Sequence, residues 1–172
     1  MIVKRIVLGP LSTTVYLIIK DNNCLIVDPA YDFEIIKKEI GTLNLVGILI
    51  THYHFDHIGA LEQLKKHYNV PVYDYNFNNI TVENFNFEII HNPGHTSDSV
   101  TFYFKDDKIM FVGDFIFKES IGRTDLETGN MEEMLNSLKM IKKYDNDIVL
   151  YPGHGDSTTL GYEKRNNIYL KG

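Results

Sequence analysis

The stretch that most constrains this chain is residues 51–57, Thr-His-Tyr-His-Phe-Asp-His, which places four good metal ligands within six positions. It directly follows the apolar run 45–50, which reads as a β-strand. Strand periodicity would put His52, His54 and Asp56 on one side of the chain, and a short loop could turn His57 inward as well. Imidazole nitrogens and carboxylate oxygens suit Zn²⁺, Fe²⁺ or Mn²⁺. A solvated polar loop has no need of three imidazoles, so the stretch favours a metal site.

Size and composition are those of an ordinary globular protein. The 172 residues fit a single domain, 1–172, with enough chain to bury a core. Hydrophobic residues make up 44% and charged residues 23%, which argues against a disordered or fibrous chain. The formal net charge of −6 gives no broad electrostatic footprint for nucleic acid, so no nucleic-acid partner is expected.

The cysteine count and the N-terminus indicate a compartment. One cysteine, Cys24, excludes an intramolecular disulfide and agrees with a reducing environment, where it would be a buried packing residue. The start of the chain lacks the pattern of a signal peptide, and no apolar run reaches transmembrane length. We therefore expect a cytoplasmic protein with no membrane partner.

Hydrophobic periodicity divides the first half into strands and two helices. Strands are predicted over 1–8, 13–20, 24–27 and 45–50. Phe33, Ile36 and Ile40 recur at helical spacing before a capping Gly41, and a second helical face (Ile58, Leu61, Leu64, Tyr68) follows the ligand stretch, with Asp56 near its N-terminus.

The second half repeats the order of strands followed by a helix. Strands are predicted over 70–73, 85–89, 100–104, 109–112 and 148–151, and a loop over 118–129. Asn130 is a suitable N-cap for a helix whose predicted buried face is Met131, Met134, Leu135, Leu138 and Ile141. The similarity of Ile26-Val27-Asp28 to Phe111-Val112-Gly113-Asp114 suggests an internal duplication.

Three more ligand-type residues follow apolar runs in the second half. His95, Asp114 and His154 each stand in a turn that contains Gly or Pro, just past a predicted strand. Turns at strand ends lie at the rim of a sheet, so six or seven ligands could converge there.

These motifs resemble the metallo-β-lactamase superfamily. The resemblance rests on residues 51–57, Gly94-His95-Thr96, Gly113-Asp114 and Gly153-His154-Gly155, and runs from about residue 13 to the C-terminus. Ile121-Gly122-Arg123-Thr124-Asp125-Leu126 further resembles the glyoxalase II-like branch of short hydrolases. The resemblance implies an α/β (α+β) fold, a four-layer αββα sandwich of two mixed sheets with helices outside and metals at one edge.

Carried over by position, the resemblance implies two divalent ions, Zn²⁺ first and Fe²⁺ or Mn²⁺ otherwise. His52, His54 and His95 would hold one ion, Asp56, His57 and His154 the second, and Asp114 would bridge them. Two metals about 3.5–4 Å apart can lower the pKa of a bridging water to near neutrality. The resulting hydroxide would attack a thioester carbonyl, with Asp56 and Asp114 as catalytic residues and no serine or cysteine nucleophile.

Four residues around the ligands carry further predictions. Asp28 would orient a ligand or its loop, or it is a turn-forming Asp-Pro. Thr96 would be a turn hydroxyl or support a ligand. Arg123 would grip a substrate carboxylate, or pair with Asp125 and shape the loop. Lys118 would add positive charge near the pocket.

The chain departs from the family pattern in ways that bear on substrate. It stops where larger glyoxalase II enzymes continue into a helical domain that helps to hold glutathione, so glutathione as the carrier is open. Aspartate at position 114, the short length and the missing signal peptide argue against a secreted antibiotic-hydrolysing enzyme.

Three functions follow, in order of preference. The first is a dinuclear metal hydrolase of a small hydroxyacyl thioester resembling S-lactoylglutathione, acting as a monomer or homodimer. The second is a mononuclear Fe²⁺ persulfide dioxygenase using His52, His95 and Asp114. The third is a non-catalytic metal-binding module.

Overall fold

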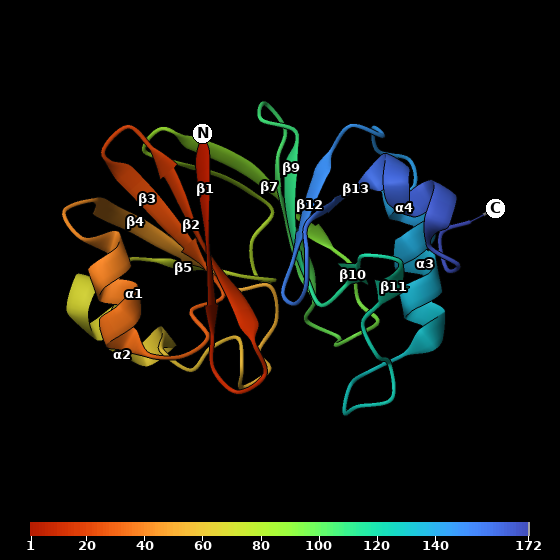
Figure 1. The fold of residues 1–172 in the computed structure, drawn as a ribbon, viewed down its shortest axis with the longest axis horizontal. Coiled ribbons are helices and arrows are strands. Elements are labelled where there is room, and N and C mark those ends of the chain that lie inside the picture. The colour runs from red at the N-terminus through yellow and green to blue at the C-terminus, as the bar shows by residue number, and fades with distance from the viewer. Residues whose placement is uncertain (172) are drawn as a thin grey trace.

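The computed structural model describes residues 1–171 and shows two mixed β-sheets facing each other with helices on both outer sides (Figure 1). The first sheet has the order β1–β2–β3–β4–β5, namely Ile2–Leu8, Thr13–Lys20, Asn23–Val27, Asn44–Leu49 and Val72–Tyr73. The second has the order β13–β12–β9–β8–β7–β6, namely Thr158–Thr159, Val149–Pro152, Ile109–Gly113, Val100–Phe104, Phe85–His91 and Asn79–Val82. The helices are α1 (Phe33–Ile40), α2 (Leu61–Tyr68), α3 (Met131–Ile141) and α4 (Leu160–Asn166).

The layers follow from strands that are apolar on both faces. In β2, Val15 and Leu17 pack under α1 and α2, whereas Tyr16 and Ile18 point between the sheets. A strand covered on both sides buries every residue, which explains near-continuous apolar runs in place of an alternating pattern. Aromatic rings from the second sheet, including Phe111, fill the space between the sheets, and a third apolar cluster lies under α3 and α4. The predicted αββα sandwich is confirmed.

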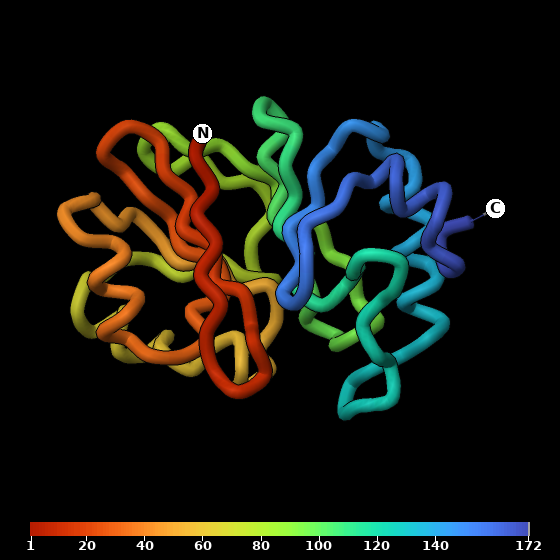
Figure 2. The backbone as a smooth tube through the Cα atoms, viewed as in Figure 1, coloured from red at the N-terminus to blue at the C-terminus, as the bar shows by residue number. Residues whose placement is uncertain are grey.

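The pairing of the strands places the segments that follow them at one edge of each sheet. β3 and β4 run parallel, as do β9 and β12, so the segments that follow each pair leave from the same edge of their sheet. The tube in Figure 2 shows the loops after these strands meeting where the two sheets approach each other. The sites of the predicted ligands are therefore brought together by topology rather than by sequence proximity.

The structure corrects several sequence-based boundaries. α2 begins only at Leu61, so Asp56 and Ile58 precede the helix. The segment before it turns back on itself, with the His57 N–H donating to the His54 carbonyl at 3.0 Å. In the segment predicted as a loop, β11 (Ser120–Ile121) pairs with β10 (Ile116–Phe117), and both strands are too short to show a period.

The buried face of α3 is narrower than predicted. Met134, Leu138 and Ile141 are buried as expected, but Met131 and Leu135 are 45% and 41% exposed. Ser137 completes the buried face by donating a hydrogen bond to the Pro93 carbonyl. The Asn130 cap is confirmed, since its side chain accepts from the backbone N–H groups of residues 132 and 133. Within residues 1–171, the helices are all too short or too polar to span a bilayer.

Candidate metal centre

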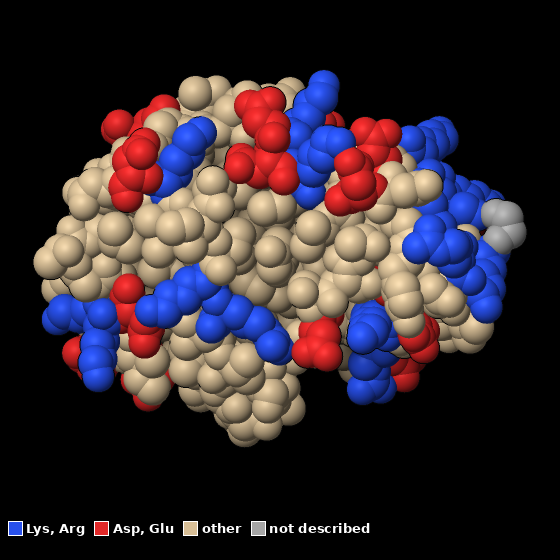
Figure 3. Space-filling model, turned by 45° about the horizontal axis from the view of Figure 1, so that its top comes forward, with Lys and Arg blue, Asp and Glu red and all other residues tan. Residues whose placement is uncertain are grey.

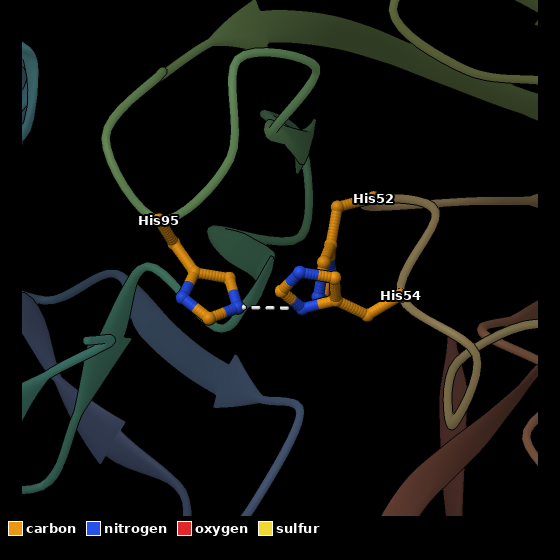
Figure 4. Close-up of side chains that lie close together, drawn as sticks. All are labelled: His52, His54 and His95. Atoms are coloured by element: carbon orange, nitrogen blue, oxygen red, sulfur yellow. Dashed lines mark hydrogen bonds between the residues drawn. The ribbon is translucent and has the colours of Figure 1, made fainter. Parts of the chain in front are cut away.

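The seven predicted ligand side chains converge at the edge where the two sheets meet. Four come from the loop after β4, and the others come from the β7–β8 loop, the end of β9 and the end of β12. They form three overlapping groups whose ligand atoms lie within 4.8 Å of one another: His52, His54 and His95; His52, His57 and Asp114; and Asp56, His57 and His154. Figure 4 shows the first group, with His95 reaching from the opposite loop toward His54.

Asp114 lies between the two sides of this cluster. Its Oδ1 is 3.4 Å from His57 Nε2, and its Oδ2 is 3.6 Å from His95 Nε2 and 3.5 Å from His154 Nε2. On one flank His95 Nε2 is 3.0 Å from His54 Nδ1, and on the other His154 Nε2 is 3.3 Å from Asp56 Oδ2. The carboxylate of Asp114 therefore faces ligands of both sides, and its Oδ2 lies between His95 and His154.

Hydrogen bonds on the far side of the rings fix how the imidazoles point. Nδ1 of His57 lies 2.9 Å from Asp28 Oδ2, that of His95 lies 2.7 Å from the Arg123 carbonyl, and that of His154 lies 3.2 Å from the Leu11 carbonyl. These oxygens can only accept, so each Nδ1 carries a proton, and each Nε2 is the ring nitrogen directed at the centre. Such outer contacts are typical of metal-ligating histidines.

Asp28 combines both roles considered for it from the sequence. Its backbone is left-handed (φ 49°) as in a turn, while its carboxylate is buried. One oxygen accepts the Thr51 backbone N–H at 2.8 Å, and the other accepts the Thr51 hydroxyl at 2.6 Å together with the His57 ring N–H. The Thr51 hydroxyl in turn lies 3.0 Å from His52 Nδ1, so one carboxylate organises the start of the whole ligand loop.

A close approach of backbone to the centre requires glycine at position 153. A Cβ there would lie 2.4 Å from Asp114 Oδ1 and 2.6 Å from His57 Cε1. Only a residue without a side chain allows β12 to come this close to the candidate ligands.

Three buried atoms without hydrogen-bond partners indicate that the site suits a cation. His52 Nε2, His57 Nε2 and Asp114 Oδ1 are fully buried and have no hydrogen-bond partner. Leaving such atoms unpaired is costly. His52 and His57 belong to the two predicted ligand sets and Asp114 lies between them, so divalent cations bound at the cluster would satisfy all three atoms.

The pKa values of the cluster also indicate that its carboxylates need positive charge nearby. Burial opposes the charged form of His57, but the carboxylates of Asp28 and Asp114 raise its pKa to about 10. Contacts with Asp114 and Asp56 raise the pKa of His154 to about 9. Despite its burial, Asp114 has a pKa well below its usual range because His154 and His57 face it. Without a metal, protons on imidazoles balance the buried carboxylates.

A cavity of about 500 Å³ opens beside the cluster. It is lined by Leu11, His54, Phe55, Asp56, His95, Asp114, Phe117, Arg123, Leu126 and His154. A space of this size accepts a small organic molecule next to the candidate ligands.

The chain matches a known protein family. A family model described as the metallo-beta-lactamase superfamily matches residues 8–77 and 74–154. The chain belongs to this superfamily. Its fold binds divalent metals, and its members are mostly hydrolytic metalloenzymes.

Relatives and solved structures of the superfamily cover nearly the whole chain. The hydroxyacylglutathione hydrolase GloC of Haemophilus influenzae is 33% identical over 87% of this chain and 88% of its own length. The probable metallo-hydrolase YqgX of Bacillus subtilis is 32% identical, covering 98% and 97%. Among solved structures, the B3 metallo-beta-lactamase BLEG-1 superposes with a TM-score of 0.95 at 31% identity, covering 99% of this chain and 100% of that one.

Two further solved structures also resemble this chain. TTHA1623, solved in a di-iron-bound form, has a TM-score of 0.86 at 30% identity, covering 98% of this chain and 100% of that one. ETHE1 from Myxococcus xanthus has a TM-score of 0.87 at 26% identity, covering 98% and 84%.

Of the residues predicted to surround the site, the structure places some at the cavity and others away from it. Arg123 lines the cavity and also pairs with Asp125, its Nε and Nη2 lying 2.7 and 2.9 Å from the two carboxylate oxygens. Thr96 is buried, with its hydroxyl 2.7 Å from Ser99 Oγ, as expected for a turn hydroxyl. Lys118 is not brought to the cavity; it lines a separate hollow with Thr158 and neighbouring residues.

Sequence reasoning missed two sets of residues at the site. The Thr13 hydroxyl donates to Asp56 Oδ2 at 2.8 Å from the start of β2, more than forty positions away in the chain. The apolar cavity wall, which includes Leu11 and Phe117, was also missed. A single threonine or leucine at the end of a strand carries no pattern that marks it as part of a site.

Proposed function

We propose that this protein is a dinuclear metal-dependent hydrolase that cleaves a small thioester, with hydroxyacyl thioesters such as S-lactoylglutathione as the reference substrate. One observation carries the proposal. Two ligand groups on opposite sides of Asp114, each with a buried imidazole Nε2 that lacks a partner, lie beside a cavity of substrate size. The name of the Haemophilus influenzae relative supplies the substrate class.

We assign the candidate ligands to two ions as the family resemblance implies. His52, His54 and His95 would hold one ion, Asp56, His57 and His154 the other, and Asp114 both. Two divalent ions would supply a water of lowered pKa and polarise the substrate carbonyl. Zn²⁺ is the first choice, and Fe²⁺ or Mn²⁺ fits the same donors.

The residues of the chain position the ligands and the attacking water. Asp28 holds His57 in the tautomer that leaves Nε2 free, and the Arg123 carbonyl does the same for His95. Asp56 lines the cavity, and its pKa is lowered because contacts with His154 and His57 outweigh its burial, so it is ionised at neutral pH. Asp56 is therefore placed to accept a hydrogen bond from the attacking water and to orient it, while the proton passes on to the leaving thiolate. Hydrolysis then breaks the C–S bond, giving a carboxylic acid and a thiol.

The main alternative is a mononuclear iron persulfide dioxygenase that uses His52, His95 and Asp114. We retain this alternative because the chain resembles ETHE1 in structure. The second group, Asp56, His57 and His154, favours the hydrolase because a three-ligand iron site leaves it without a role.

The test begins with protein purified without added metal. Metal per chain is quantified, and the same sample is assayed on S-lactoylglutathione, on glutathione persulfide with an oxygen electrode, and on a β-lactam because of the likeness to BLEG-1. About two metals per chain with thioester hydrolysis and no oxygen uptake supports the proposal. One iron per chain with oxygen uptake establishes the dioxygenase, and metal without any turnover indicates a binding module.

A further inference from the structure

Four apolar side chains line the cavity. We call Leu11, Phe55, Phe117 and Leu126 the apolar collar. Phe55 is 66% exposed, Leu11 52% and Leu126 41%, so these three contribute little to the folded core. Exposed apolar side chains scattered singly need no explanation, but several that line one cavity beside a polar cluster indicate a binding surface.

The collar is built from four separate parts of the chain. Leu11 comes from the β1–β2 turn, Phe55 from the ligand loop, Phe117 from β10 and Leu126 from the loop that precedes α3. Figure 3 shows an uncharged bulge at the lower edge of this face, with charged residues on either side. The convergence of four segments at one cavity is a property of the fold.

Collar residues also lie directly against candidate metal ligands. The Leu11 carbonyl accepts from His154 Nδ1, and the Phe117 ring stands edge-on to the His154 ring at 6.1 Å between centroids. Leu11 and Phe117 therefore lie beside His154 on a wall that a substrate entering this cavity would contact.

The same cavity offers little free positive charge of its own. Among the described residues that line it, Arg123 is the only lysine or arginine, and its guanidinium is held at two points by Asp125. A thiol carrier bearing carboxylates would have to compete with Asp125 for that guanidinium. The guanidinium of Arg123 therefore gives the carboxylates of glutathione little advantage over an uncharged carrier at this wall.

We propose that the collar selects thioesters that are uncharged and apolar next to the scissile bond, with an alkyl or aryl group on the acyl or the thiol side. This inference rests on the proposed thioester hydrolysis. It names Phe55, Leu11 and Leu126 as specificity-determining residues and Arg123–Asp125 as a neutral pair in the wall.

The experiment uses the metal-loaded full chain and two matched series of substrates. In one, the acyl group grows from acetyl to hexanoyl on the uncharged thiol N-acetylcysteamine; in the other, the thiol of an acetyl thioester grows from ethyl to hexyl. Each methylene that reaches the collar should raise kcat/KM by up to about fourfold. At least one series should therefore rise by tenfold or more, and the hexanoyl thioester of glutathione should not exceed its N-acetylcysteamine counterpart.

Variants assign the effect to the collar. Phe55→Ser should reduce the hexanoyl-to-acetyl ratio of kcat/KM at least threefold, whereas Ile168→Ser, at an equally exposed position (71%) outside the cavity, should leave the ratio unchanged. Asp125→Asn should release Arg123 and shift preference severalfold toward the glutathione thioester.

Binding of product acids separates this inference from the proposed hydrolysis. Calorimetry should show hexanoate binding at least tenfold more tightly than acetate, with the difference reduced in Phe55→Ser. That result supports apolar selection by the collar even if no thioester is hydrolysed, in which case the hydrolase proposal alone fails. Flat substrate series and equal binding of the two acids would overturn the collar proposal, with hydrolysis still standing if acetyl thioesters are cleaved.

Discussion

The ring Nδ1 of His95 lies 2.7 Å from the backbone carbonyl oxygen of Arg123. The loop that walls the cavity thus also sets the direction of a candidate metal ligand, because the same ring directs Nε2 toward Asp114 and His54. Substrate contact and metal geometry share one short stretch of backbone.

This contact predicts the tautomers of the histidines. His57, His95 and His154 should carry their proton on Nδ1, where a protein oxygen accepts it. His54 should carry its proton on Nε2, because its Nδ1 faces the centre. Long-range ¹⁵N–¹H spectra of Zn²⁺-loaded protein distinguish the two tautomers, and an Nδ1 lone pair on His95 would contradict the assigned orientation.

Removal of the central carboxylate should disable both sides of the site. Asp114→Ala is expected to abolish thioester hydrolysis and to lower metal content below half that of the parent protein, because Asp114 faces ligands on each flank. His67→Ala is the control, since His67 lies on α2 and packs against Phe33. Full activity in Asp114→Ala would refute a bridging role.

Asp28 should matter through His57 rather than through the backbone. Asn tolerates the left-handed conformation at this position, but its amide would present a donor to the two donors that Asp28 Oδ2 now accepts. Asp28→Asn should weaken metal affinity by about 10–100-fold in chelator competition. Asp21→Asn makes the same change at another left-handed position outside the site and should have no effect on affinity.

Metal binding should release protons. The pKa values of His57 and His154 are raised to about 10 and about 9, so both rings are protonated at pH 7.5 in the metal-free protein. A metal ligand must be neutral, so the ion displaces these protons and its apparent affinity should increase as pH rises toward 9–10. Zn²⁺ titration in buffers of different ionisation enthalpy counts the protons released, and a count of zero would contradict this account.

Two neighbouring glycines provide a matched pair. Gly153→Ala would place a methyl group 2.4 Å from Asp114 Oδ1 and should lower both metal content and activity at least tenfold. Gly155→Ala meets no atom within 4 Å, although its φ of 77° is strained for alanine. It should cost about 1–2 kcal/mol of unfolding free energy and keep the metal. Equal metal loss in both variants would show that backbone strain, not contact, is responsible.

The sequence predicted most of the fold because its signals were local. Apolar runs and caps located α1, α3 and most strands correctly. It failed where the structure depends on long-range contact: β6 (Asn79–Val82) is a polar edge strand defined by pairing with β7, and β10 and β11 are two residues each. Leu135 was assigned to the core by periodicity, but the buried face of α3 consists of Met134, Ser137, Leu138 and Ile141, and Leu135 lies outside that face.

The candidate ligands were predictable because their residue types are conspicuous beside apolar runs. Their surroundings were not, because the contacts join distant positions: Thr13 meets Asp56, and Leu11 meets His154. Lys118 shows the converse, since its charge suggested a role near the pocket while β10 and β11 place it beside another hollow.

The division of the ligands between the two sheets has a mechanical consequence. His52, His54, Asp56 and His57 follow the first sheet, whereas His95, Asp114 and His154 belong to the second. An ion at this edge would link the two sheets, because it would bind side chains from both of them. Removal of the ion by a chelator should therefore weaken the packing of one sheet against the other before it disturbs either sheet. Separation of the sheets would expose the aromatic rings packed between them.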